Sequence, residues 1–183
     1  NNGAVDLRTG ELFPHSPEQK FTYCISTDYN PRVDDTDWND YVYRSVKPNE
    51  KEDNGEYVEL TAWLQMAVGY SLTGFTNEQC CFYLEGPPRA GKGIFLQMIT
   101  GLLGRPLASG IDFDSFTAKR GGNSQNFDLA PLKACRMITA SETDNVGQIN
   151  AKTLKAVTGN DMIYCSYKHG QFFSYLPQYK IWI

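Results

Sequence analysis

The sequence predicts an α/β fold in which a mostly parallel sheet is flanked by helices and follows a mainly helical N-terminal part. Three observations lead to this expectation. From residue 77 onward, short apolar runs alternate with segments of helical periodicity, as parallel strands joined by helices require. Before that point, two helical patterns dominate. Between an apolar run and a helical segment lies the glycine-rich segment Gly86–Gly93, which places the fold among phosphate-loop NTPases.

Composition excludes several classes of protein. Hydrophobic residues make up 41% of the 183 residues, and the formal net charge is −4, so the chain does not coat nucleic acid through its overall charge. No apolar run approaches the ~20 residues of a membrane span and no signal peptide is visible, which predicts a cytoplasmic protein without a membrane partner. The 5 cysteines have no paired spacing, so we expect reduced, buried thiols and no zinc site.

The N-terminal part, residues 1–76, is expected to contain one hairpin and two helices. Two short β-prone runs around Thr9-Gly10 predict the hairpin. A helix is expected over residues 36–47, with Trp38, Tyr41, Val42, Ser45 and Val46 on one face. A second helix is expected from about Glu56 to Thr73, with Tyr57, Leu60, Leu64, Ala67, Val68 and Leu72 as its apolar stripe.

The second part, residues 77–183, alternates strands and helices. We expect helices at Lys92–Leu103, with a stripe of Phe95, Met98, Ile99 and Leu102, and at Asn150–Val157, with Gly159 after it. Strands are expected at Cys80–Leu84, Arg136–Ala140 and Tyr179–Ile183. The chain starts at Asn1 rather than Met and stops inside a predicted strand, so we expect a piece of a longer protein.

The pattern G-x-x-x-x-G-K is met by Gly86, Gly91 and Lys92. Glycines let the backbone curl so that its N–H groups, with the positive end of the following helix, hold triphosphate oxygens. Lys92 adds a mobile charge for the β- and γ-phosphates. ATP is therefore the expected ligand, and the predicted binding residues are Gly86, Pro87, Pro88, Arg89, Ala90, Gly91, Lys92, Gly93 and Ile94.

One position departs from the full motif. Gly93 stands where Ser or Thr would offer a hydroxyl to Mg²⁺, and Ile94 offers none either. The metal must then be held by phosphates, water and other residues. This departure bears on catalysis more than on binding.

A phosphate-loop ATPase also needs a carboxylate at the end of a neighbouring strand, to hold the metal or to polarise water. The apolar run Arg136–Ala140 ends in Ser141-Glu142. We predict Glu142 as the water-activating base and metal ligand, with Asp144 in reserve. The alternative is a solvated acidic turn.

Two β-prone runs, Met162–Tyr167 and Gln171–Tyr175, flank Lys168-His169-Gly170 and predict a hairpin with a basic tip. Lysine and histidine can contact phosphates, and a tyrosine can stack on a base. Lys119-Arg120-Gly121-Gly122 forms a second basic spot. In both cases an ordinary solvated surface loop is the alternative.

Several stretches together resemble a superfamily 3 helicase of the phage and plasmid primase–helicase type, an AAA+-like ATPase. Only the phosphate loop is specific by itself, and the order and spacing of the motifs carry the resemblance. The stretches are Asn2–Leu12, Leu64–Gly74, Gly86–Gly93, Ala118–Asn123, Leu129–Thr143, Leu154–Asp161 and Pro177–Ile183.

The resemblance implies roles for matching positions. Lys92 is the loop lysine and Glu142 the acidic residue of the second nucleotide motif. The segment Leu154–Tyr175 matches the family's helix and hairpin that approach a single DNA strand in the central pore of a hexamer, which implies that Lys168 and His169 contact DNA. Residues 1–76 match the small helical domain that precedes the motor.

The family continues with a sensor residue and an arginine that lie past Ile183, so an isolated fragment is expected to be a poor ATPase. A primase module or partner is common in the family, and replication in a bacterial host or at a viral site is the implied setting.

Three functions follow from these observations. The first is an ATP-dependent DNA helicase motor in viral, phage or plasmid replication. The second is a phosphate-loop phosphotransferase, which tolerates Gly93 but needs an arginine-rich lid that the sequence lacks. The third is a non-catalytic nucleotide-binding or assembly module, favoured by the missing hydroxyl at residue 93.

Overall fold

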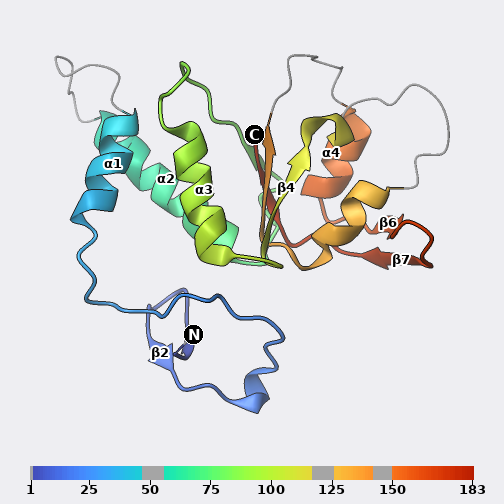
Figure 1. The fold of residues 1–183 in the computed structure, drawn as a ribbon, viewed down its shortest axis with the longest axis horizontal. Helices are drawn as coiled ribbons and strands as arrows, with labels where there is room; N and C mark the ends of the chain where they lie inside the picture. The colour runs from blue at the N-terminus through green and yellow to red at the C-terminus, as the bar shows by residue number, and fades with distance from the viewer. Residues whose placement is uncertain (1, 47–55, 117–125, 142–149) are drawn as a thin grey trace. The chain divides into compact units, whose positions relative to one another are not determined.

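A computed structural model describes residues 2–46, 56–116, 126–141 and 150–183. These residues form two compact units, Asn1–Tyr70 with Glu85–Leu103 and Ser71–Leu84 with Gly104–Ile183 (Figure 1). The helix after the phosphate loop belongs to the first unit, so these units do not follow the predicted division of the chain. The domain boundary between residues 76 and 77 stays a prediction. Among the described residues, none of the helices combines the length and apolar character needed to cross a bilayer.

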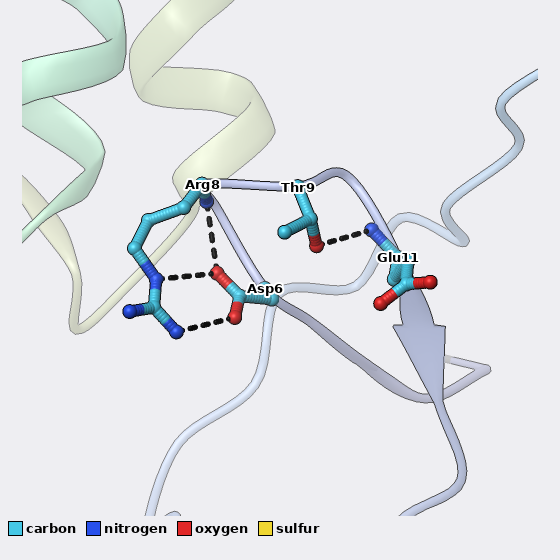
Figure 2. A network of polar contacts seen from close by, with 4 residues as sticks. All are labelled: Asp6, Arg8, Thr9 and Glu11. Atoms are coloured by element: carbon cyan, nitrogen blue, oxygen red, sulfur yellow. Dashed lines mark hydrogen bonds and ion pairs between the residues drawn. The ribbon is translucent and has the colours of Figure 1, made fainter.

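The first unit begins with the predicted hairpin. Strands β1 (Ala4–Val5) and β2 (Leu12–Phe13) pair antiparallel. The Asp6 carboxylate closes the turn: it accepts a backbone hydrogen bond from Arg8 at 2.9 Å and guanidinium hydrogen bonds at 2.7 and 3.1 Å (Figure 2). These contacts lower the pKa of Asp6 to about 2. Gly10 takes the left-handed conformation, with φ of 73°, that such a turn favours.

Two helices precede the phosphate loop, α1 (Thr36–Val46) and α2 (Glu56–Leu72), and each ends within one residue of its predicted end. The Asp34 carboxylate accepts hydrogen bonds from the Thr36 N–H and hydroxyl, at 3.0 and 2.6 Å, and so holds the start of α1. Within α2, Leu64 and Ala67 are buried as predicted. Leu60 is 40% exposed, so its place in the predicted stripe is wrong.

Helix α3 (Lys92–Leu103) follows the phosphate loop. Its buried side chains, Phe95, Ile99 and Leu103, recur every four residues. The prediction that Met98 and Leu102 share this stripe is wrong, because they are 57% and 40% exposed. Both lie one position, about 100° of helix rotation, from the buried row, and sequence periodicity does not resolve that difference.

The second unit contains a four-stranded parallel sheet in the order β3-β8-β5-β4. Its strands are β3 (Cys81–Phe82), β4 (Ala108–Asp112), β5 (Met137–Ser141) and β8 (Lys180–Trp182). A mostly parallel sheet was predicted and is confirmed. Strand β4 was not predicted, because Ser109 and Gly110 interrupt its apolar pattern. It exists through its pairing with all five residues of β5.

Both faces of the central strands are buried, as is usual for parallel strands. Ile138 and Ile181 point to one face and are fully buried, while Met137 and Trp182 point to the other and are equally buried. On the second face, the Trp182 indole donates a 3.0 Å hydrogen bond to the hydroxyl of Ser71, at the end of α2.

The first face carries the main core of this unit. Packed there are α4 (Ala151–Thr158), the hairpin of β6 (Ile163–Ser166) and β7 (Phe172–Tyr175), and two 3₁₀ segments, Phe113–Phe116 and Phe127–Ala134 (Figure 1). Helix α4 confirms its predicted ends: the Asn150 side chain caps it and Gly159 follows it. The buried thiols expected from the sequence are Cys135 and Cys165, whereas Cys24 is exposed.

Candidate functional site

The predicted phosphate loop, Gly86–Gly93, has a strand before it and a helix after it, the context that anion binding requires. Strand β3 is followed by Leu84, whose N–H donates a 2.8 Å hydrogen bond to the carbonyl of Ile183. Eight residues further along, α3 begins at Lys92. The first N–H groups of a helix have no carbonyl partner within it, so the loop ends on a cluster of donors at the positive end of a helix.

Within the loop, two left-handed residues flank Ala90. Arg89 has φ of 66° and Gly91 has φ of 89°. The Ala90 N–H donates a 3.3 Å hydrogen bond to the Pro87 carbonyl and closes a turn. A backbone that alternates in this way directs successive N–H groups into one concavity, which is the arrangement that holds phosphate oxygens.

The Lys92 ammonium is half-buried and folds back over this loop. It donates hydrogen bonds to the carbonyl oxygens of Gly86 and, at 3.1 Å, of Pro87. If a triphosphate replaced these neutral carbonyl acceptors, the ammonium would bond to charged oxygens instead. Such charge-assisted hydrogen bonds are the stronger kind.

Helix α1 anchors the loop through Tyr41, a residue that sequence reasoning assigned only to an apolar face. The Tyr41 hydroxyl donates a 2.8 Å hydrogen bond to the Gly91 carbonyl. A Cβ added at Gly91 would lie 3.1 Å from the Tyr41 and Ser45 hydroxyl oxygens. Two features therefore favour glycine at position 91: its left-handed φ and the close approach of these two hydroxyl groups. Nearby, the Trp38 and Phe95 rings stack 5.9 Å apart at 14°.

A cavity of about 920 Å³ lies between α1 and the loop, within the first unit. Its size falls in the range of small-molecule sites, about 300–1,000 Å³. Charged residues of both signs line it. The ion pair between Asp40 and Arg44, at 3.6 Å, is exposed and contributes little stability. The loop residues on the wall are Gly86, Pro87, Arg89, Ala90, Gly91, Lys92 and Ile94.

The predicted acidic partner lies outside the described residues. Glu142 and Asp144 fall within residues 142–149, and Lys119 and Arg120 within residues 117–125. The sheet nevertheless fixes where β5 ends. Thr139 lies beside Trp182, which lies beside Phe82, so the parallel strands β5 and β3 leave the sheet at the same edge. Glu142 directly follows the last residue of β5.

The predicted hairpin in the second unit is confirmed. Strands β6 and β7 pair antiparallel, and Lys168 and His169 lie exposed at the tip. His169 has φ of 65°, and the Gly170 N–H donates a 2.8 Å hydrogen bond to the Tyr167 carbonyl. The tip therefore presents both side chains to solvent, and their contact with nucleic acid stays a prediction.

The base of the hairpin is fixed by two contacts with the preceding 3₁₀ segment. The Tyr175 hydroxyl donates a buried 2.7 Å hydrogen bond to the Leu129 carbonyl. The Asn126 amide donates to the Tyr164 carbonyl at 3.2 Å. Burial raises the pKa of Tyr175 above its usual range, so this donor keeps its proton at neutral pH.

One buried charge was missed from the sequence. Lys180, in β8, is 2% exposed, and its ammonium donates hydrogen bonds to the Thr73 and Phe75 carbonyls at 2.6 and 3.0 Å. Burial, with Arg136 nearby, lowers its pKa from 10.5 to about 8. The sequence feature that could have indicated this buried charge is a lysine within the largely apolar run PQYKIWI. Its role is structural, because it satisfies carbonyls beyond the end of α2.

Comparison with known proteins gives three likenesses. Residues 1–57 match the family described as D5 N terminal like. Over 180 residues, 98% of the chain, the sequence is 24% identical to "Putative helicase L207/L206" of Acanthamoeba polyphaga mimivirus, and it spans 18% of that protein. The fold resembles the apo structure of the NrS-1 C-terminal region, with a TM-score of 0.52 and 11% identity over 79% of this chain and 33% of that one.

The three likenesses rest on different properties. The family match covers the N-terminal third, the viral relative covers nearly the whole sequence, and the solved structure bears on the fold alone. The family match and the viral relative agree with the resemblance to superfamily 3 primase–helicase-type proteins, and the solved structure agrees with the fold.

Proposed function

We propose that the chain is part of an ATP-dependent DNA helicase motor that acts in viral, phage or plasmid DNA replication. The observation that carries this proposal is the loop between β3 and α3. Its left-handed Gly91, its lysine and the first turn of a helix converge beside a nucleotide-sized cavity. The comparisons support the helicase family, and the ATP-driven step is inferred from the site.

In this proposal, ATP places its phosphates on the N–H groups around Ala90–Gly93. Lys92 then leaves the Gly86 and Pro87 carbonyls for the β- and γ-phosphates. Glu142, which follows β5 in the sequence, is assigned the role of polarising the attacking water. Glu142 would be the candidate ligand of a Mg²⁺ ion, which would supply charge neutralisation when bound with the triphosphate, because Gly93 and Ile94 offer no hydroxyl.

Movement along DNA is assigned to the basic tip of the hairpin. Lys168 and His169 are exposed there, on a support fixed by the buried Tyr175. A homo-hexamer with one DNA strand in its central pore, a primase module or partner, and a cytoplasmic setting follow from likeness to the family. The chain spans 18% of the viral relative, so these properties belong to a larger protein.

The decisive experiment compares Lys92→Ala with Lys152→Ala, an exposed lysine of α4, in the whole protein. We expect Lys92→Ala to lower DNA-stimulated ATP hydrolysis by about 100-fold or more, since it removes a charge that stabilises the transition state. DNA unwinding should be lost with it. Full unwinding by Lys92→Ala would refute the proposal.

A second pair of variants tests the base. Glu142→Gln should bind ATP and hydrolyse it at least about 100-fold more slowly, because it keeps the side-chain size and loses the proton acceptor. Asp144→Asn is its matched control and should retain hydrolysis. The reverse result would assign the role to Asp144.

The non-catalytic module remains the second candidate because Gly93 lacks the metal-binding hydroxyl. It predicts nucleotide binding without hydrolysis in the whole protein. Calorimetric titration with ATP, with and without Mg²⁺, combined with a phosphate-release assay, separates the two functions. Transfer of phosphate to a nucleoside monophosphate would instead identify a phosphotransferase.

A further inference from the structure

The β6–β7 hairpin carries aromatic side chains on the face that it turns away from the core. Side chains alternate between the two faces along a strand, so Tyr164 and Phe172 point opposite to the inward set. They are 71% and 67% exposed. The inward set, which packs on or within the core, consists of Ile163, Cys165, Phe173 and Tyr175.

The cross-strand register makes the two outward rings neighbours. Tyr164 lies opposite Ser174, and Phe172 lies opposite Ser166, one pair further toward the tip. Tyr164 and Phe172 are therefore diagonal partners on one face, at a separation of about 7–8 Å for such positions. Two rings at this spacing can each receive one base of the same extended strand.

The charge around these rings suits a polyanion. The hairpin itself carries no Asp or Glu from Met162 to Ile183, in a chain with 21 acidic residues and a net charge of −4; among the described residues, the nearest carboxylates in sequence and packing are Asp161, just before it, and Asp128, two residues after Asn126. Lys168 and His169 stand exposed at the tip. Phosphates thus meet cations beside the rings, whereas a second copy of this acidic chain would gain less from the same charges.

We propose that this outward face, with Tyr164 and Phe172, is a stacking platform for the bases of a single-stranded nucleic acid. The inference rests on the proposed function and adds to it a stacking contact with the faces of the bases, in addition to contacts with the phosphates. Stacking on aromatic rings tolerates any base, which suits a protein that follows a strand regardless of its sequence.

The experiment measures binding of fluorescein-labelled oligothymidylate, and of an oligouridylate of equal length, to the whole protein by fluorescence polarisation. Tyr164→Ala and Phe172→Ala should each weaken binding about five- to 150-fold. Tyr164→Phe keeps the ring and should bind within twofold of the unchanged protein. Phe21→Ala, an aromatic residue that is likewise 71% exposed, is the matched control.

Salt dependence separates stacking from charge. The aromatic variants should keep the slope of log affinity against log salt, whereas Lys168→Ala should lower its magnitude by about one. Wild-type binding of the oligonucleotide, with Tyr164→Ala and Phe172→Ala no weaker than Phe21→Ala, would overturn the platform and leave the helicase proposal standing. Failure of the unchanged protein to bind either oligonucleotide would overturn both.

The remaining competing occupant is a second copy of the chain. Sedimentation of each variant at the same concentration tests it. An unchanged oligomeric state alongside weaker nucleic-acid binding supports the platform. Loss of assembly in Tyr164→Ala or Phe172→Ala, with equal loss of binding, would overturn it in favour of a subunit interface.

Discussion

The two edges of the four-stranded sheet differ in how they use their polar groups. At the amino ends of the strands, Lys180 donates to the Thr73 and Phe75 carbonyls, and the Arg136 guanidinium donates to the Gln178 side chain. After β3 the chain continues into Gly86–Gly93, where, among the described residues, Lys92 donates to the Gly86 and Pro87 carbonyls and the Tyr41 hydroxyl donates to the Gly91 carbonyl.

The buried lysine at the amino edge serves the stability of the second unit, whereas we expect the donors of the loop after β3 to serve a ligand. At the amino edge, Lys180 is buried and bonded to residues more than 100 positions away in the same unit, so changing it costs folding free energy. In the loop after β3, Lys92 donates to neutral carbonyls that the oxygens of a ligand could replace. Ligands of open parallel sheets bind beyond the carboxyl ends of the strands for the same reason.

The largest expected effect is on the free energy of unfolding, when Lys180 at the amino edge of the sheet is replaced. Lys180→Ala removes two buried hydrogen bonds and the packing of the lysine stem, and should lower the free energy of unfolding by about 2–4 kcal/mol. Urea unfolding checks it, with exposed Lys155→Ala as the control. Nucleotide affinity of the folded variant should stay within twofold. A stability change below about 0.5 kcal/mol would contradict the structural role.

The next-largest effect is expected for ATP binding, when Gly91 of the loop before α3 is replaced. Gly91→Ala forces a side chain into a φ of 89° and within 3.1 Å of the Tyr41 hydroxyl. It should weaken ATP binding at least tenfold in calorimetry and lower stability by about 1–2 kcal/mol. Gly101→Ala, in α3 with open space at its Cβ, should instead raise stability by up to about 1 kcal/mol. Equal behaviour of the two variants would remove the special role of Gly91.

The lowered pKa of Lys180 makes stability depend on pH. With a folded pKa of about 8 against 10.5 when unfolded, Lys180 binds fewer protons in the folded state between these values, so stability rises with pH there. From pH 8 to 10 the unchanged protein should gain about 1–2 kcal/mol relative to Lys180→Met. Urea unfolding at each pH measures this difference. Parallel curves for the two proteins would show that Lys180 titrates normally.

The smallest effect concerns the tyrosine that holds the loop. Tyr41→Phe removes one hydrogen bond to the Gly91 carbonyl, worth about 0.5–1.5 kcal/mol, and should weaken ATP binding about two- to tenfold. Exposed Tyr23→Phe serves as the control and should bind ATP normally. If Tyr41→Phe binds as tightly as the control, α1 packs on the loop without positioning it.

Much of the local structure was predictable from the sequence. The ends of α4 depend on Asn150 and Gly159, which act on neighbours within four residues. The hairpin around Lys168-His169-Gly170 depends on its own turn. Prediction was wrong where burial depends on distant packing, as for Met98 and Leu102, and incomplete for β4, whose interrupted pattern becomes a strand through β5.

The order of the helices and of the strands other than β4, and the strand–loop–helix context of the lysine, could be predicted from the sequence, because capping, turns and periodicity act over a few residues. Three features became visible only in the folded chain: the strand order β3-β8-β5-β4, the burial of Lys180 and the contact between Tyr41 and Gly91. Lys180 meets Thr73 across 107 residues, and Tyr41 meets Gly91 across 50. Contacts of that range depend on how whole elements pack, which no local pattern encodes.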